Sequence, residues 1–209
     1  DLRTEFKAGH FTALSPLLKE GLKETLSRGE QAILLLNRRG YATFIICREC
    51  GSVLKCPACD VSLTYHQRPN LLNCHYCDYR KVPPDLCPNC KSHYLRYFGR
   101  GTERLEEELT SAFPEARILR MDRDTTRRKG SHEKIYRRLV RGEADILLGT
   151  QMVAKGLDLP EVTLVGVIAA DGALNLPDFR SAERTYQILT QAAGRAGRGD
   201  KSGVVFIQT

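Results

Sequence analysis

Eight cysteines are the residues of this sequence whose type and spacing point most directly to chemistry. All lie within residues 47–90, in four pairs with two residues between the partners: Cys47 and Cys50, Cys56 and Cys59, Cys74 and Cys77, Cys87 and Cys90. Two thiolates at this spacing suit one tetrahedral Zn²⁺, and amides of the turn between them can donate to sulfur. Disulfides, an iron–sulfur cluster and thioredoxin-like redox pairs are the alternatives, but a redox motif is not expected to recur four times in one short stretch. The pattern predicts two structural zinc ions, because cysteine fills every ligand position.

Spacing alone leaves open which pairs share a metal, since four pairs can combine in three ways. The 14 residues between Cys59 and Cys74 contain apolar runs at 63–65 and 71–73, which predict a two-stranded ribbon with a zinc ion at one end. The outer pairs would then close a second site where the segment leaves and rejoins the rest of the chain. Three histidines lie nearby, and we expect them to be surface or packing residues because cysteine already completes two ligand sets: His66, His75 and His93.

The rest of the sequence alternates short apolar runs with helical patterns. Ser15-Pro16 predicts the start of a helix that continues to about residue 27. Strands are predicted at 31–37, 95–98, 117–121, 145–149, 162–169 and 203–207, and further helices at 102–112, 131–141 and 181–193. Strands separated by helices predict an α/β fold with a parallel sheet covered on both faces. We expect residues 1–46 and 91–209 to form this domain and residues 47–90 to be a zinc-binding insertion.

Loops at the carboxyl ends of the strands are where an α/β sheet places its ligands. One such loop, residues 149–158, offers small and hydroxyl-bearing residues that could take a phosphate, and Asp158 could accept from a ribose hydroxyl. An ordinary turn around Gly156 is the alternative. Another, residues 37–41, combines Arg38 and Arg39 with an aromatic residue and suits a nucleic-acid backbone or an adenine.

A third segment in this group, residues 191–199, has two arginines among Gly and Ala residues, whose small side chains let the backbone approach another surface closely. Arg195 and Arg198 could approach a transferring phosphate as arginine fingers do. A solvated basic helix end is the alternative, and it gives no reason for glycines that alternate with arginines. Two more basic clusters, 127–129 and 137–141, are expected to be solvated faces more often than DNA contacts.

A phosphate-gripping P-loop is absent from the sequence. Gly194 and Gly199 have the spacing of such a loop, but Asp200 precedes Lys201, and the segment leaves a helix where a P-loop must leave a strand. The chain therefore combines arginines suited to sensing a phosphate with no loop to hold one, and by itself it is expected to be inactive.

The composition of the chain limits the classes of protein to which it can belong. Of 209 residues, 42% are apolar and 27% charged, which suffices for a folded core and excludes a disordered chain. The formal net charge of +7 favours an anionic partner without requiring one. The sequence has neither a membrane-spanning run nor a signal peptide, and it begins without Met. We expect a piece excised from a longer protein that does not contact membranes.

Together these segments resemble the second RecA-like lobe of superfamily 2 helicases. Residues 150–158 are similar to helicase motif V, residues 191–198 (Q-x-x-G-R-x-G-R) to motif VI, and the segment around Arg38 and Arg39 to motif IV. Within that superfamily, four C-x-x-C pairs placed between motif IV and the next strand resemble one family, the primosomal replication-restart helicases of bacteria. Further segments that fit this family lie at 37–41, 47–51, 120–126, 149–158 and 176–184.

The resemblance implies an ATP-driven 3′–5′ DNA helicase that recognises stalled forks and restarts replication by primosome assembly. It implies catalytic roles for Arg195, Arg198 and Gln191, nucleotide contacts for Gly156 and Asp158, and DNA contacts for Thr150, Gln151, Arg38 and Arg39. It also implies that the outer cysteines bind one zinc ion and the inner cysteines the other. ATP with Mg²⁺ would be bound mainly by another lobe. The implied partners are forked and single-stranded DNA, primosome proteins and single-stranded-DNA-binding protein, at the nucleoid in the bacterial cytoplasm.

Two other classes compete with this reading. The chain could be a non-enzymatic zinc-ribbon module that binds DNA or protein, with the α/β domain as its scaffold. A scaffold, however, has no need for the Gly–Arg segment at 191–199. A non-helicase translocase of the same superfamily is the other alternative, for which an eight-cysteine insertion at this point is unexpected.

Overall fold

The structure is a computed structural model of the 209-residue chain. It describes residues 2–7, 12–36, 44–66, 69–98, 102–122, 125–126, 130–150, 153, 159–170, 174, 180–197 and 201–209. Several residues to which the sequence assigned roles lie outside the described ones: Arg38, Arg39, Gln151, Gly156, Asp158 and Arg198.

Helices in the described part are α1 (Leu2–Lys7), α2 (Pro16–Ser27), α3 (Thr102–Ala112), α4 (Ser131–Val140) and α5 (Ser181–Ala193). The strands are β1 (Gln31–Leu36), β2 (Phe44–Cys47), β3 (Thr64–His66), β4 (Leu71–Asn73), β5 (Arg80–Lys81), β6 (Leu95–Phe98), β7 (Ile118–Met121), β8 (Ile146–Gly149), β9 (Val162–Ile168) and β10 (Val204–Ile207). The four predicted helices are confirmed to within a residue at each end, and α2 begins as predicted, with the Ser15 hydroxyl accepting from the Leu18 amide.

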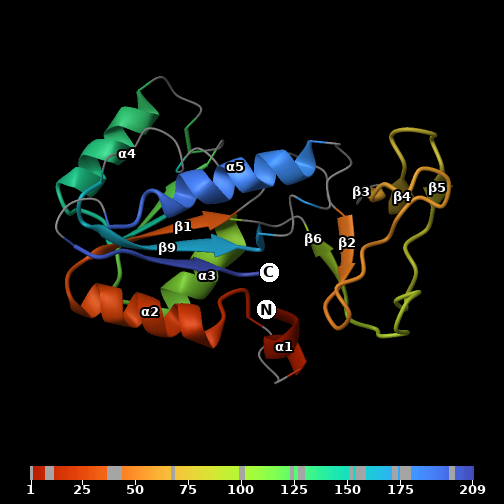
Figure 1. Ribbon diagram of the computed structural model, residues 1–209, viewed down its shortest axis with the longest axis horizontal. Coiled ribbons are helices and arrows are strands. Elements are labelled where there is room, and N and C mark those ends of the chain that lie inside the picture. The colour runs from red at the N-terminus through yellow and green to blue at the C-terminus, as the bar shows by residue number, and fades with distance from the viewer. Residues whose placement is uncertain are drawn as a thin grey trace.

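Five of the strands form one parallel sheet in the order β10-β9-β1-β8-β7 (Figure 1). The central strands β1, β8 and β9 are buried along their whole length. Their near-continuous apolar sequences are typical of parallel strands with both faces covered. The α/β fold class with a parallel sheet is therefore confirmed.

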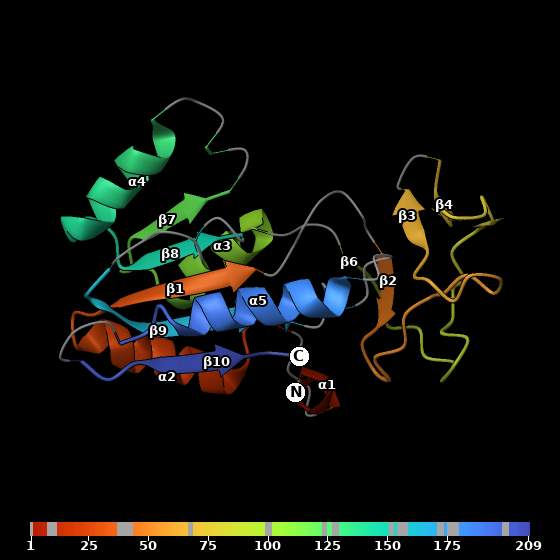
Figure 2. The same cartoon turned by 45° about the horizontal axis from the view of Figure 1, so that its top comes forward.

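The alternation of side chains along β1 builds two hydrophobic cores, one on each face of the sheet. Ala32, Leu34 and Leu36 belong to the core under α2 and α3. Ile33 and Leu35 belong to the core under α4 and α5. Figure 2 shows the two helix layers on opposite sides of the sheet. Because every βα unit crosses back over the sheet, each helix ends at the edge where the next strand begins.

The cysteine-rich segment lies beside the carboxyl end of the sheet, as a smaller unit with its own core (Figure 1). Strands β3, β4 and β5 form an antiparallel sheet, which confirms the predicted ribbon and adds a short third strand. Its core consists of Ile45, Leu54, Cys56, Leu63, Leu72 and Cys74.

One predicted strand has a different neighbour from the one expected. Residues 95–98 form β6, but β6 pairs antiparallel with β2 in a separate two-stranded sheet, so its predicted place in the parallel sheet is wrong. The physical reason is that β2 and β6 flank the cysteine-rich segment, whose closure brings its two ends together. The division into a domain of residues 1–46 and 91–209 and an insertion of residues 47–90 stays a prediction.

Within the described ranges, no helix is both long and apolar enough to cross a membrane.

Candidate metal centres and the two edges of the sheet

The eight cysteines gather into two clusters of four. In each cluster the four Sγ atoms lie within 4.8 Å of one another, and the members are Cys47, Cys50, Cys87 and Cys90 in one and Cys56, Cys59, Cys74 and Cys77 in the other. The outer pairs therefore meet each other and the inner pairs meet each other. The nested arrangement, which spacing favoured without deciding, is the one that the structure contains.

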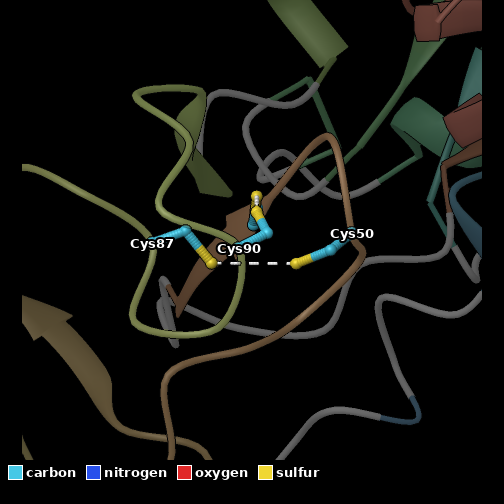
Figure 3. Close-up of side chains that lie close together, drawn as sticks. Cys50, Cys87 and Cys90 are labelled. Atoms are coloured by element: carbon cyan, nitrogen blue, oxygen red, sulfur yellow. Dashed lines mark hydrogen bonds between the residues drawn. The ribbon is translucent and has the colours of Figure 1, made fainter.

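The sulfur–sulfur distances suit a tetrahedral metal site. Sγ of Cys50 lies 3.7 Å from Sγ of Cys87, and the two side chains point toward each other in Figure 3. Sγ of Cys56 lies 3.5 Å from Sγ of Cys77. A tetrahedron with Zn–S bonds of about 2.3 Å has edges of about 3.8 Å, so a zinc ion fits between these sulfurs with little adjustment.

All four C-x-x-C turns share one backbone geometry. The first cysteine of each turn accepts, at its carbonyl, from the amide four residues on: Gly51, Asp60, Asp78 and Lys91 donate to Cys47, Cys56, Cys74 and Cys87. Each of these four donors also has a positive φ, between 53° and 73°. Glycine and aspartate adopt this conformation readily, whereas lysine does so rarely. The repeated turn holds each pair of thiols in the same relative position and was not predicted from the sequence.

Hydrogen bonds and burial give the thiols different pKa values. Burial raises the pKa of Cys50, but hydrogen bonds from the Asn89 side chain and the Ser52 amide outweigh it and bring that pKa to about 6. The pKa of Cys59 shifts in the opposite direction. It is raised to about 12, and the side-chain hydrogen bond with Cys77 is the main cause. Four thiols whose sulfur atoms lie this close together cannot all ionise unless a cation lies among them. The donor set and the electrostatics both call for a divalent, thiolate-binding metal.

The carboxyl edge of the sheet holds Thr150, which follows β8 directly. Its amide lies 3.4 Å from the carbonyl oxygen of Met121, the last residue of β7, and its side chain is half-buried. Gly149 must lack a side chain here, because a Cβ atom would lie 2.4 Å from that same carbonyl oxygen.

A buried carboxylate at this edge organises the loop after β7. Asp122 is 6% exposed and accepts from the Thr102 hydroxyl at 2.8 Å and from the Thr125 amide at 2.9 Å. Arg120 Nε lies 3.0 Å from the same carboxylate. Burial raises the pKa of Asp122, but these partners outweigh it and the pKa is lowered overall. The sequence did not mark Asp122 for this role.

Gln191 and Arg195 lie at the opposite edge. Helix α5 runs back across the sheet, so its last turn approaches the start of β9, where the Gly197 amide donates to the Val162 carbonyl at 3.1 Å. The expectation that this segment belongs with the loops at the carboxyl ends of the strands is therefore wrong for residues 191–197. The sequence places this segment after a helix, and a helix of a βαβ unit ends at the amino edge.

Two glycines near Arg195 are required because two backbone segments pack against each other with no room for a side chain. Gly197 has a φ of 69°, and a Cβ atom on it would lie 2.4 Å from the Gly203 amide nitrogen. A Cβ atom on Gly203 would lie 2.3 Å from the Gly197 nitrogen. The two backbones pack directly on each other, which fixes the end of the arginine-bearing segment against the start of β10. Gln191 is exposed and Arg195 is half-buried.

Comparison with protein families gives two matches along the chain. The model of the PriA DNA helicase Cys-rich region (CRR) domain matches residues 56–81. The model of the helicase conserved C-terminal domain matches residues 91–200.

Similar curated proteins are replication restart proteins. The chain is 56% identical over 209 residues to "Replication restart protein PriA" of Bacillus subtilis, which covers 100% of the chain and 26% of that protein. It is 53% identical over 213 residues to the protein of that name from Synechocystis sp., again covering 100% of the chain and 26% of the relative. Identity to the Haemophilus influenzae protein is 47% over 196 residues, with coverage of 94% and 27%. The chain thus spans about a quarter of the length of these relatives, and the predicted resemblance is confirmed.

Solved structures of helicases are more distant. The Saccharomyces cerevisiae structure "Dbp5 L327V bound to RNA and ADP BeF3" has a TM-score of 0.41 and 14% identity, covering 91% of the chain and 32% of that protein. The Pyrococcus furiosus Hef helicase domain has a TM-score of 0.39 and 18% identity, with coverage of 91% and 24%.

Proposed function

We propose a function from the premise that the chain belongs to the family of the helicase conserved C-terminal domain, which residues 91–200 match. The chain is the second RecA-like lobe, with an inserted zinc module, of an ATP-driven 3′–5′ DNA helicase that recognises stalled replication forks and restarts replication. The observation that carries the proposal is that one chain combines this helicase domain with the cysteine-rich region matched at residues 56–81. A translocase of another branch of the superfamily has no reason to contain both.

The site residues divide between the two edges of the sheet. Arg195, at the amino edge, and Arg198 face the γ-phosphate of Mg-ATP bound mainly by the first lobe, and Gln191 supports them. Gly156 and Asp158 contact the nucleotide from the loop after β8. Thr150 and Gln151, with Arg38 and Arg39 after β1, contact the translocating DNA strand. The buried strands β1, β8 and β9 link these positions as one rigid body, which suits the coupling of hydrolysis to movement along DNA.

Two zinc ions complete the inserted module, one in each Cys₄ cluster. The sulfur–sulfur distances support this assignment, and so does the contrast within one cluster between Cys50, whose pKa is lowered to about 6, and Cys90, whose pKa is raised to about 12. With all positions filled by cysteine, each ion has a structural role. It holds its two turns together and offers no open position for a reactant.

The partners of the whole protein follow from the same premise. They are forked and single-stranded DNA, primosome proteins and single-stranded-DNA-binding protein, and the protein works at the nucleoid in the bacterial cytoplasm. The relatives named replication restart proteins support this assignment.

The test is a substitution in the full-length protein. Arg198→Ala, and separately Arg195→Ala, should reduce DNA-stimulated ATP hydrolysis by about 10³-fold, the typical effect of an arginine finger, and leave fork binding unchanged. Arg28→Ala, at an exposed ion pair near the end of α2, is the control and should keep full turnover. Unchanged hydrolysis in both finger variants would favour the alternative, a zinc-ribbon module that binds DNA or protein on an α/β scaffold. The 209-residue chain alone should show no ATPase activity.

A further inference from the structure

Helix α4 presents a strongly basic face to solvent. Ile135 and Leu139 anchor the helix in the core under α4 and α5. The other side exposes four cations at helical spacing: Lys134, Arg137, Arg138 and Arg141. Arg137 and Arg141 are 65% and 69% exposed, so a large partner can reach their guanidinium groups. We call these four residues the α4 basic face.

The α4 basic face borders a shallow hollow of about 570 Å³, completed by Gly130, Glu133 and Glu143. Arg137 pairs with Glu133 at 2.6 Å, and Arg138 and Arg141 lie 3.4 and 3.8 Å from Glu143. Two carboxylates against four cations leave a surplus of positive charge. Ion pairs this exposed are weak enough to exchange for phosphate.

We propose that the α4 basic face binds the phosphate backbone of duplex DNA. Three arginines and a lysine are the side chains that phosphate contacts use most. Lys134 to Arg141 span about 10 Å along the helix, which corresponds to about three intervals of about 3.4 Å between successive phosphates of one strand, measured along the DNA axis.

The lining of the hollow favours duplex DNA over other anionic partners. Among the described residues that line it there is no aromatic side chain on which an unpaired base could stack. The lining also lacks an apolar pocket that would anchor an acidic peptide. Contacts to phosphate alone suit a duplex, whose bases are paired and stacked inside the helix, and such contacts give no sequence preference.

This surface is separate from the proposed contacts to the translocating strand. Arg141 and Glu143 lead into the start of β8 at the amino edge of the sheet, whereas Thr150 follows the end of β8 at the carboxyl edge. Figure 1 shows α4 at the end of the molecule away from the cysteine-rich module. The inference rests on the proposed function, because it assigns a second DNA contact to the same helicase lobe.

The experiment compares two triple variants of the full-length protein. The test variant is Arg137→Gln/Arg138→Gln/Arg141→Gln. The control is Lys23→Gln/Arg28→Gln/Lys201→Gln, which removes the same charge elsewhere and likewise breaks exposed pairs with glutamate. Binding of a fluorescein-labelled blunt 20-base-pair duplex and of a 20-nucleotide single strand is measured by anisotropy over a KCl series, together with single-strand-stimulated ATP hydrolysis.

We expect the test variant to bind the duplex at least about tenfold more weakly, with a slope of log K against log salt that is shallower by about 2 to 3. The test variant should bind the single strand and hydrolyse ATP as the parent protein does. The control variant should match the parent protein in every measurement. Equal duplex affinity and slope in the two triple variants would overturn the proposal, and so would an equal loss of duplex and single-strand binding in the test variant. A parent protein that neither binds DNA nor hydrolyses ATP would overturn the proposed function as well, and that result is distinguishable from the others.

Discussion

Sγ of Cys47 lies 3.5 Å from Sγ of Cys90, although 43 positions separate the two residues. Cys47 ends β2 and pairs in register with Leu95 of β6, so the outer cluster lies where the cysteine-rich segment leaves and rejoins the chain. A metal bound at this point would close a long loop, and its binding free energy would offset the entropic cost of bringing the two ends of the loop together.

The nested pairing predicts different zinc losses for two double variants. Cys47→Ser/Cys90→Ser removes two ligands from one cluster and should leave about one zinc ion per chain. Cys50→Ser/Cys77→Ser removes one ligand from each cluster and should leave close to none. Zinc content by inductively coupled plasma mass spectrometry checks this, with His93→Ala expected to retain both ions. Equal losses in the two double variants would contradict the nested arrangement.

The Asp122 carboxylate should stabilise the fold in a pH-dependent way. Its pKa is lowered below the ordinary 3.8, so its contribution is complete above that value and is lost as the pH falls through the lowered pKa. Asp122→Asn should lower the free energy of unfolding by about 1.5 to 3 kcal/mol at neutral pH, the range for hydrogen bonds to a charged group. Urea unfolding at neutral pH and at successively lower pH measures the difference between variant and parent. A difference that stays constant below pH 3.8 would show that the charge is not its source.

Gln31 should be a strong stabiliser of the end of α4. Its buried Nε2 donates to the Leu139 carbonyl at 2.9 Å and to the Ala144 carbonyl at 2.8 Å. Gln31→Leu leaves both carbonyls without this donor, and we expect a loss of about 1 to 3 kcal/mol in the free energy of unfolding. Gln187→Leu, on the exposed side of α5, is the matched control and should change stability by less than about 0.5 kcal/mol. Similar unfolding midpoints for the two variants would refute the role given to Gln31.

Gly203→Ala should disturb the arginine-bearing segment. The added methyl group would lie 2.3 Å from the backbone of Ala196 and Gly197, which cannot move aside as a flexible side chain could. We expect a loss of about 1 to 3 kcal/mol in stability, and a loss of at least about tenfold in DNA-stimulated hydrolysis by the full-length protein because Arg195 is displaced. For Gly194→Ala the nearest atom would be 3.5 Å away, so its stability should stay close to that of the parent. Thermal unfolding of both variants separates the two cases.

Local pattern was enough to place most of the elements. The helices at 102–112 and 181–193 and the ribbon at β3 and β4 follow from periodicity and turn residues, which act over a few positions. The parallel sheet follows from the alternation of strands and helices. Strand β2 was missed because its neighbour β6 is remote in the sequence, and β6 was assigned to the wrong sheet for the same reason.

The sequence by itself determined that eight thiols stand at the spacing of metal ligands and that an α/β lobe carries paired arginines, because ligand spacing and side-chain chemistry are local properties. Only the tertiary structure decided that the outer cysteines meet each other, that Asp122 joins Thr102 to Thr125, and that Arg195 and Thr150 lie at opposite edges of the sheet. These relations depend on the direction in which each helix returns across the sheet and on the closure of a long insertion. Both are set by packing between segments that are distant in the chain.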